Sequence, residues 1–168
     1  MTDTTQRRLQ LWVDADACPN VIKDILFRAA EKRRVICTLV ANQPIPVPRV
    51  DWLRSIQVPA GFDVADDRIV ELIQSGDLAI TADIPLAAKV VTKGAFALNP
   101  RGSFYTKENI QQRLTMRNFM EELRSSGVQV GGPAAFGLQD RMAFANTLDR
   151  FLTQHLPRPS SPQKEEKS

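Results

Sequence analysis

The strongest constraint on the fold of this chain is a regular alternation of apolar, strand-like runs with helix-like segments. Runs of the kind that parallel strands bury on both faces occupy residues 11–14, 35–41 and 78–81. Helix-like segments, with apolar residues on one face and glycine or proline near their ends, occupy residues 20–32, 64–75 and 83–93. Because strands that alternate with helices form parallel sheets covered by helices, the pattern predicts an α/β fold. We expect a three-layer sandwich with a mostly parallel central sheet.

The rest of the chain fits the same single domain. Shorter strands are expected at 55–58 and 95–98, and further helices over 107–125 and from about residue 140 onward. A length of 168 residues is typical of one domain, which we assign to residues 9–156. The remaining residues, 157–168, are proline, serine and charged residues with no apolar content, and they are predicted to be a disordered tail.

The reactive side chains exclude several kinds of chemistry. The single histidine, His155, lies close to the C-terminus, which excludes Ser-His-Asp and Cys-His catalysis and any histidine-rich zinc site. Cys18 and Cys37 form no Cys-x-x-Cys pair, and we expect both to be reduced thiols. No apolar run approaches the length of a membrane span, and the first ten residues lack the apolar core of a signal peptide. We therefore expect a cytoplasmic protein with no membrane partner.

Aspartates recur where the predicted strands meet the predicted helices. The aspartates at these junctions are Asp14, Asp16, Asp63, Asp66, Asp67 and Asp83. Because open α/β sheets place their ligands at the carboxyl ends of the strands, we expect these side chains to converge at one edge. Clustered carboxylates repel one another unless a cation offsets their charge, and Mg²⁺ or Mn²⁺ is the usual resolution. The pattern predicts a divalent-metal site of the kind that hydrolyses phosphodiesters.

Helix capping is the alternative explanation for each aspartate taken singly. A carboxylate at a helix N-terminus accepts backbone hydrogen bonds and interacts favourably with the helix dipole. Capping explains Asp83 as well as metal binding does, and it is the favoured role of Asp63. It does not explain why aspartate stands at three separate junctions, where serine, threonine or asparagine would cap equally well.

Five segments carry a resemblance to a known family: VDADACPNVIKD, GFDVADDRIV, GDLAITADIPLA, LNPRGSFYT and LTMRNFMEELRSSG. Together they resemble the YaiI/YqxD family of uncharacterised bacterial proteins, from about Leu11 to Leu152. That family is grouped with PIN-like domains, whose better-known members are Mg²⁺- or Mn²⁺-dependent ribonucleases. The resemblance therefore implies a PIN-like fold and a metal-dependent nuclease that acts on RNA.

The resemblance also assigns roles to individual acids. In the PIN pattern an acid ends the first strand, another lies on a mid-chain helix, and another follows a strand in a T-x-D context. Asp14, Asp66 and Asp83 match these positions and are the expected metal ligands. Asp16 and Asp63 match the family's own D-x-D and D-x-x-D patterns, and they would bind the metal through water or orient the attacking water. These five aspartates are the implied catalytic set.

Other residues near these motifs are candidates for substrate binding. Arg101 in NPRG and Arg117 in TMRNFM could hold phosphate oxygens, because an arginine fork suits phosphate. A salt bridge or a solvated position is the alternative for each. Asn99 stands where PIN nucleases have a fourth acid, and its amide oxygen can still ligate a metal. The net charge of +3 permits an anionic partner such as RNA, while the oligomeric state is left open.

Two other functions remain open from the sequence. A non-catalytic RNA- or protein-binding module with a degenerate metal site fits Asn99 and the modest basic charge. A phosphatase of the haloacid-dehalogenase type fits the D-x-D at Asp14 and the later Thr81 loosely. That class needs its acidic pair after the Ser/Thr motif, whereas the pair in this chain precedes Thr81, so we rank the phosphatase last.

Overall fold

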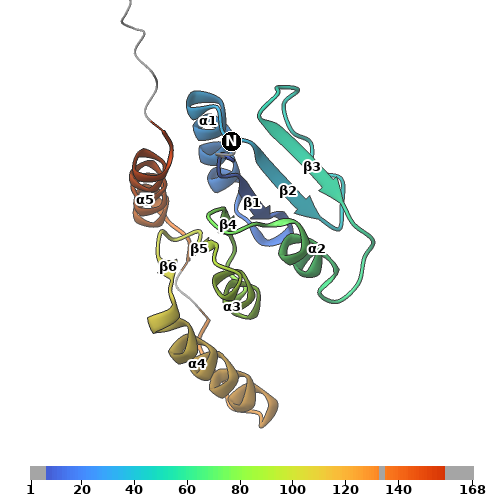
Figure 1. Ribbon diagram of the computed structural model, residues 1–168. Helices are drawn as coiled ribbons and strands as arrows, with labels where there is room; N and C mark the ends of the chain where they lie inside the picture. The colour runs from blue at the N-terminus through green and yellow to red at the C-terminus, as the bar shows by residue number, and fades with distance from the viewer. Residues whose placement is uncertain (1–6, 133–134, 158–168) are drawn as a thin grey trace, which may run out of the picture.

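The computed structural model describes residues 7–132 and 135–157, and its centre is a six-stranded sheet in the order β3-β2-β1-β4-β5-β6 (Figure 1). The strands are β1 (Leu11–Asp14), β2 (Cys37–Ala41), β3 (Leu53–Gln57), β4 (Leu78–Ile80), β5 (Phe96–Leu98) and β6 (Phe104–Tyr105). All neighbouring strands pair in parallel except β5 and β6, which are antiparallel. The prediction of a mostly parallel sheet is confirmed.

Helices cover both faces of the sheet and complete a three-layer sandwich. They are α1 (Asn20–Arg33), α2 (Val64–Leu72), α3 (Ile84–Thr92), α4 (Lys107–Ser125) and α5 (Leu138–His155), with a short 3₁₀ turn η1 (Ala15–Ala17) after β1. Ile22 of α1 and Phe144 of α5 are fully buried in the core on one face. Ile69 of α2 and Leu86 of α3 belong to a separate core on the other face, with Trp12 of the sheet. The predicted sandwich is therefore confirmed.

The strand order creates a topological switch point between β1 and β4. From β1 the chain winds outward through β2 to β3, and from β4 it winds the other way through β5 to β6. Open α/β sheets bind ligands at the carboxyl ends of the strands beside such a point. Asp14 ends β1 and Asp83 follows β4, so two of the predicted site residues flank the switch point.

Some element boundaries differ from the sequence-based expectation. Strand β6 was not predicted, because a two-residue strand offers no periodicity to recognise. Helix α2 ends at Leu72 instead of Ser75, since Ile73 is already extended and buries its side chain completely. Burial of one apolar residue beyond the helix therefore ends it earlier than Gly76 would.

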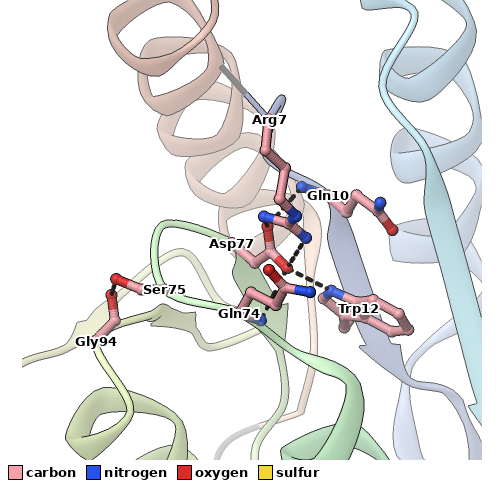
Figure 2. A network of polar contacts seen from close by, with 7 residues as sticks. All are labelled: Arg7, Gln10, Trp12, Gln74, Ser75, Asp77 and Gly94. Carbon is pink, nitrogen blue, oxygen red and sulfur yellow. Dashed lines mark hydrogen bonds and ion pairs between the residues drawn. The ribbon is translucent and has the colours of Figure 1, made fainter. Parts of the chain in front are cut away.

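A buried carboxylate, Asp77, lies at the amino end of β4, at the opposite edge of the sheet from Asp14 and Asp83. It links the segment before β1 to the segment before β4 (Figure 2). It directly precedes β4, and its side chain is 0% exposed. Arg7 donates to both of its oxygens, each at 2.8 Å, and the Trp12 indole donates at 3.0 Å. The backbone N–H groups of Gln10 and Gln74 donate at 2.9 and 3.1 Å. This degree of pairing is what a fully buried carboxylate requires, so we interpret Asp77 as a structural residue.

Helix α4 differs from the other α-helices because none of its residues is buried. Figure 1 shows it extending away from the sheet. Its first turn is fixed by a capping box in which the Thr106 hydroxyl accepts from the Asn109 N–H and the Asn109 side chain accepts from the Thr106 N–H. Ile110 packs against the α3 side of the core. The start of α4 is therefore anchored to the domain.

No helix in the described ranges is long and apolar enough to cross a membrane. The tail predicted to be disordered, 157–168, lies outside the described residues apart from Pro157.

Candidate functional site

Asp14, Thr81 and Asp83 form a hydrogen-bonded chain across the carboxyl ends of β1 and β4. The Thr81 hydroxyl donates to Asp14 Oδ2 at 2.9 Å and accepts from the Asp83 backbone N–H at 2.9 Å. Asp83 Oδ1 accepts from the Leu86 N–H at 3.0 Å, which caps α3 and confirms the capping role considered for Asp83. Because Thr81 is buried, its hydroxyl fixes the position of Asp14 relative to the start of α3.

Asp66, from the first turn of α2, lies close to this pair. Burial and the charge of Asp83 raise the pKa of Asp66 to about 7. The charge of Asp14, a hydrogen bond with Asp83 and the charge of Asp63 act in the same direction. The acidic group, defined here as Asp14, Asp16, Asp63, Asp66 and Asp83, therefore contains carboxylates from several elements that repel one another.

Asp14 and Asp16 form the β1 side of the acidic group. Burial is the main reason that the pKa of Asp14 is raised, and the charges of Asp83 and Asp16 add to it. The hydrogen bond from Thr81 lowers the pKa of Asp14 and offsets part of this shift. Asp16 is exposed, and its Oδ2 accepts from the Asn42 N–H at 2.8 Å, which links the end of β1 to the end of β2.

Asp63 does not cap α2, although it directly precedes the helix. Its backbone is left-handed, with a φ of 63°, and its side chain makes no capping hydrogen bond. The prediction that Asp63 serves as a cap is wrong, because an N-cap residue needs an extended backbone to aim its oxygen at the first-turn N–H groups. The charge of Asp63 acts on Asp66 instead.

The donor atoms at this edge suit a hard cation, but they do not form a ready-made metal site. Carboxylate and amide oxygens are the ligands that Mg²⁺ and Mn²⁺ prefer. Asn42 Oδ1, at the end of β2, is buried and has no hydrogen-bond partner within the described chain. In the described ranges, however, no group of three or more His, Cys, Asp or Glu is arranged so that it could hold a metal ion. Metal binding there would therefore need the carboxylates of the acidic group to rearrange.

Arg101 and Arg117, the two candidates for phosphate binding, contact residues outside the acidic group. The Arg101 guanidinium forms an ion pair with Asp140 at 2.8 Å and lies 5.5 Å from the centre of the Phe136 ring. Arg117 is exposed on α4, where it donates to a neighbouring asparagine. Arg101 therefore forms a salt bridge, the alternative considered for it, although its partner Asp140 is not part of the acidic group. Arg117 is a solvated side chain, as the other alternative predicted.

A second polar group lies at the carboxyl end of β5. Asn99 Oδ1 accepts from the Arg101 backbone N–H at 2.7 Å, and Asn99 Nδ2 donates to the Tyr105 hydroxyl at 2.8 Å. The Arg113 guanidinium lies 5.0 Å from the centre of the Tyr105 ring. The pKa of Tyr105 is raised, chiefly by burial. The hydrogen bond from Asn99 and the charge of Arg113 lower this pKa, whereas the charge of Asp83 raises it. Asn99 thus orients Tyr105, whose pKa is affected by the charge of Asp83.

The sequence analysis did not identify Asn42, Tyr105 or Arg113. Asn42 could have been found, because it directly follows the buried strand β2 and is therefore at the carboxyl edge. Tyr105 and Arg113 carry no comparable signal, since the pairing of β6 and the packing of α4 bring them to this edge.

Cys18, beside the acidic group, is poorly suited to act as a nucleophile. Burial raises the pKa of Cys18 to about 12, although the charge of Lys23 lowers it, and the charge of Asp14 raises it further. The thiol therefore stays protonated at neutral pH and is a poor nucleophile.

The fold and this edge define a doubly wound α/β protein with clustered carboxylates at its topological switch point. A family model described as "Uncharacterized BCR, YaiI/YqxD family" matches residues 12–154, and the chain belongs to this family. A UPF0178 protein of Marinomonas sp. (strain MWYL1) is 64% identical over 148 residues, which cover 88% of this chain and 99% of that protein. A UPF0178 protein of Herminiimonas arsenicoxydans is 65% identical over 146 residues, which cover 87% and 98%. No solved structure matches the chain.

Proposed function

We propose that this protein hydrolyses phosphodiester bonds in RNA with Mg²⁺ or Mn²⁺ bound at the acidic group. The proposal rests on one observation: Asp14, Asp66 and Asp83 come from separate elements, and besides burial the charges of Asp83 and Asp14 raise the pKa of Asp66, while the charge of Asp83 raises that of Asp14. Carboxylates that repel one another destabilise the fold, whereas a bound cation turns the same arrangement into a favourable one.

The residues of the acidic group would have separate roles in this reaction. Asp14, Asp66 and Asp83 would hold the cation, which would act as a Lewis acid and lower the pKa of a bound water. Thr81 keeps Asp14 in place through its hydroxyl. Asp66, with a pKa of about 7, must lose its proton to bind the metal, so binding is favoured above neutral pH. Asp16 and Asp63, which lie at the margin of the acidic group, would orient the attacking water.

A PIN-like domain is the class to which this proposal assigns the fold. The support is the motif pattern, with an acid ending β1, an acid on the mid-chain helix α2 and the T-x-D sequence after β4. The predominantly parallel sheet agrees with that class. We expect the protein to act in the cytoplasm, where RNA substrates are abundant.

The experiment is hydrolysis of single-stranded and structured RNAs with Mn²⁺. Asp14→Asn is expected to lower the rate at least about 100-fold, since even residues that only support metal ligands affect activity by 10–100-fold. The matched control is Asp67→Asn, an exposed aspartate in the same first turn of α2 as Asp66, which should leave the rate unchanged.

Each other outcome has a defined meaning. Hydrolysis that survives Asp14→Asn contradicts the mechanism. RNA binding that persists in EDTA, without cleavage under any metal, would favour the non-catalytic binding module. A phosphoryl group trapped on Asp14 would favour the phosphatase.

A further inference from the structure

The polar group at the end of β5 lies directly beside the acidic group. The Thr81 backbone N–H donates to the Leu98 carbonyl at 3.0 Å, and Asn99 follows Leu98 in the chain. Thr81 is also the residue whose hydroxyl contacts Asp14. Tyr105 pairs with Ala97 of β5 and belongs to the core on the α3 side of the sheet, where Asp83 begins α3. The carboxyl ends of β4 and β5 therefore carry acids and donors next to each other.

Arg113 lies over the ring of Tyr105, on the α3 side of the sheet. Its guanidinium lies against the Tyr105 ring, which is 3% exposed and therefore fixed in the core. Within the described residues no carboxylate pairs with Arg113, whereas Arg101 pairs with Asp140 and Arg124 with Glu121. A guanidinium stacked on an aromatic ring keeps its N–H groups free for a planar anion such as phosphate.

The Tyr105 hydroxyl supplies a second donor. It accepts from Asn99 Nδ2 at 2.8 Å, so its own hydrogen points elsewhere, and burial keeps the phenol protonated. The turn that carries Asn99 is itself rigid. Gly102 in this turn has a φ of 95°, and a Cβ there would lie 2.7 Å from the backbone of Ala143 in α5. The turn is thus packed tightly against α5, which fixes the orientation of Asn99 and Tyr105.

An acidic group repels a polyanion, so a strand bound there needs positive charge in addition to the metal. We propose that Arg113 and Tyr105 form a phosphate-binding subsite beside the acidic group and grip a phosphate oxygen of the RNA strand. This inference rests on the proposed function, because it takes the anion to be an RNA phosphate. It assigns to Arg113 the role that the sequence suggested for Arg101 and Arg117.

The test is the affinity of the full chain for a fluorescent single-stranded oligoribonucleotide, with Ca²⁺ in place of Mn²⁺ so that the strand is not consumed. Arg113→Gln is expected to weaken binding about tenfold, the effect of losing a hydrogen bond to a charged group. It should also reduce the salt dependence of log K by about 0.7, the contribution of one phosphate contact to a single strand. Tyr105→Phe, which keeps the ring under Arg113, should weaken binding about threefold.

Arg124→Gln removes the same charge from an exposed, paired position on α4 and is the control, with unchanged affinity expected. A 5′-phosphorylated strand compared with an unphosphorylated one distinguishes a terminal phosphate from an internal phosphodiester as the group bound. Unchanged affinity in Arg113→Gln, or an equal loss in Arg117→Gln, would overturn the subsite even if the native chain cleaves RNA. Binding that depends on Arg113 in a chain that never cleaves RNA would overturn the proposed function and leave the subsite intact.

Discussion

The two ends of strand β4 hold carboxylates in opposite situations. At the amino end Asp77 is completely buried, and a guanidinium, an indole and two backbone N–H groups donate to its oxygens. At the carboxyl end the charges of Asp83 and Asp14 raise the pKa of Asp66, and the Thr81 hydroxyl donates to Asp14. Asp77 therefore has its full complement of donors inside the protein, whereas the acidic group does not.

This difference separates a structural carboxylate from a functional one. A buried anion that is fully paired stabilises the native state relative to the same anion left unpaired, and it has no spare lone pairs for a ligand. Carboxylates that repel one another store unfavourable energy, which a bound cation or a bound proton can relieve. The number and origin of the donors, and not burial alone, distinguish the two ends of β4.

The largest effect on stability is expected at Asp77. Asp77→Asn should lower the free energy of unfolding by about 3–5 kcal/mol, the cost of breaking a buried ion pair from one side. Urea denaturation monitored by circular dichroism measures it, with Asp67→Asn as the control. A loss below about 1 kcal/mol, the size typical of surface pairs, would break the comparison by showing that the Asp77 network is not structural.

A smaller effect is expected from metal binding at the other end of β4. Mn²⁺ at about 100 times its dissociation constant should raise the free energy of unfolding of the native chain by about 2.7 kcal/mol. Asp14→Asn should abolish this increase because it removes a ligand, and Asp67→Asn should retain it. Thermal unfolding with and without Mn²⁺ is the measurement, and an equal increase in both variants would show that the metal binds elsewhere.

A further effect concerns pH and follows from the raised pKa of Asp66. The pKa of Asp66 is about 7 in the folded protein and 3.8 in an unperturbed aspartate, so between these values the native state binds more protons than the unfolded state. The free energy of unfolding should therefore fall as the pH rises from about 4 to about 7, and then level off. Asp66→Asn should flatten this part of the profile and be relatively more stable above neutral pH.

The same pH profile also tests Asp14, the other acid of this group whose pKa is raised. Asp14→Asn should flatten it as well, because the pKa of Asp14 is raised in the same sense, chiefly by burial. Urea unfolding at about pH 5 and about pH 8 gives the comparison. A profile that neither variant changes would mean that the pKa values of Asp14 and Asp66 are not raised in the folded protein.

The sequence predicted the sandwich and the edge at which the acids gather, because both follow from local patterns. Buried strands that alternate with amphipathic helices fix the layers, and strand-end residues share an edge in any parallel sheet. The failures have equally physical causes. Strand β6 is too short to show a period, and Asp63 adopts a left-handed backbone that prevents capping. Arg101 pairs with Asp140, which lies 39 residues further along the chain.

By itself the sequence determined which residues end the strands, and hence that Asp14 and Asp83 would flank one edge beside Asp66. It could not separate these acids from Asp77, which also stands next to a strand. The donors that make Asp77 structural come from Arg7 and Trp12, 70 and 65 residues away, and only tertiary packing brings them together. The same packing sets Arg113 against Tyr105 and raises the pKa of Asp66, because charge interactions depend on distance in space and on burial.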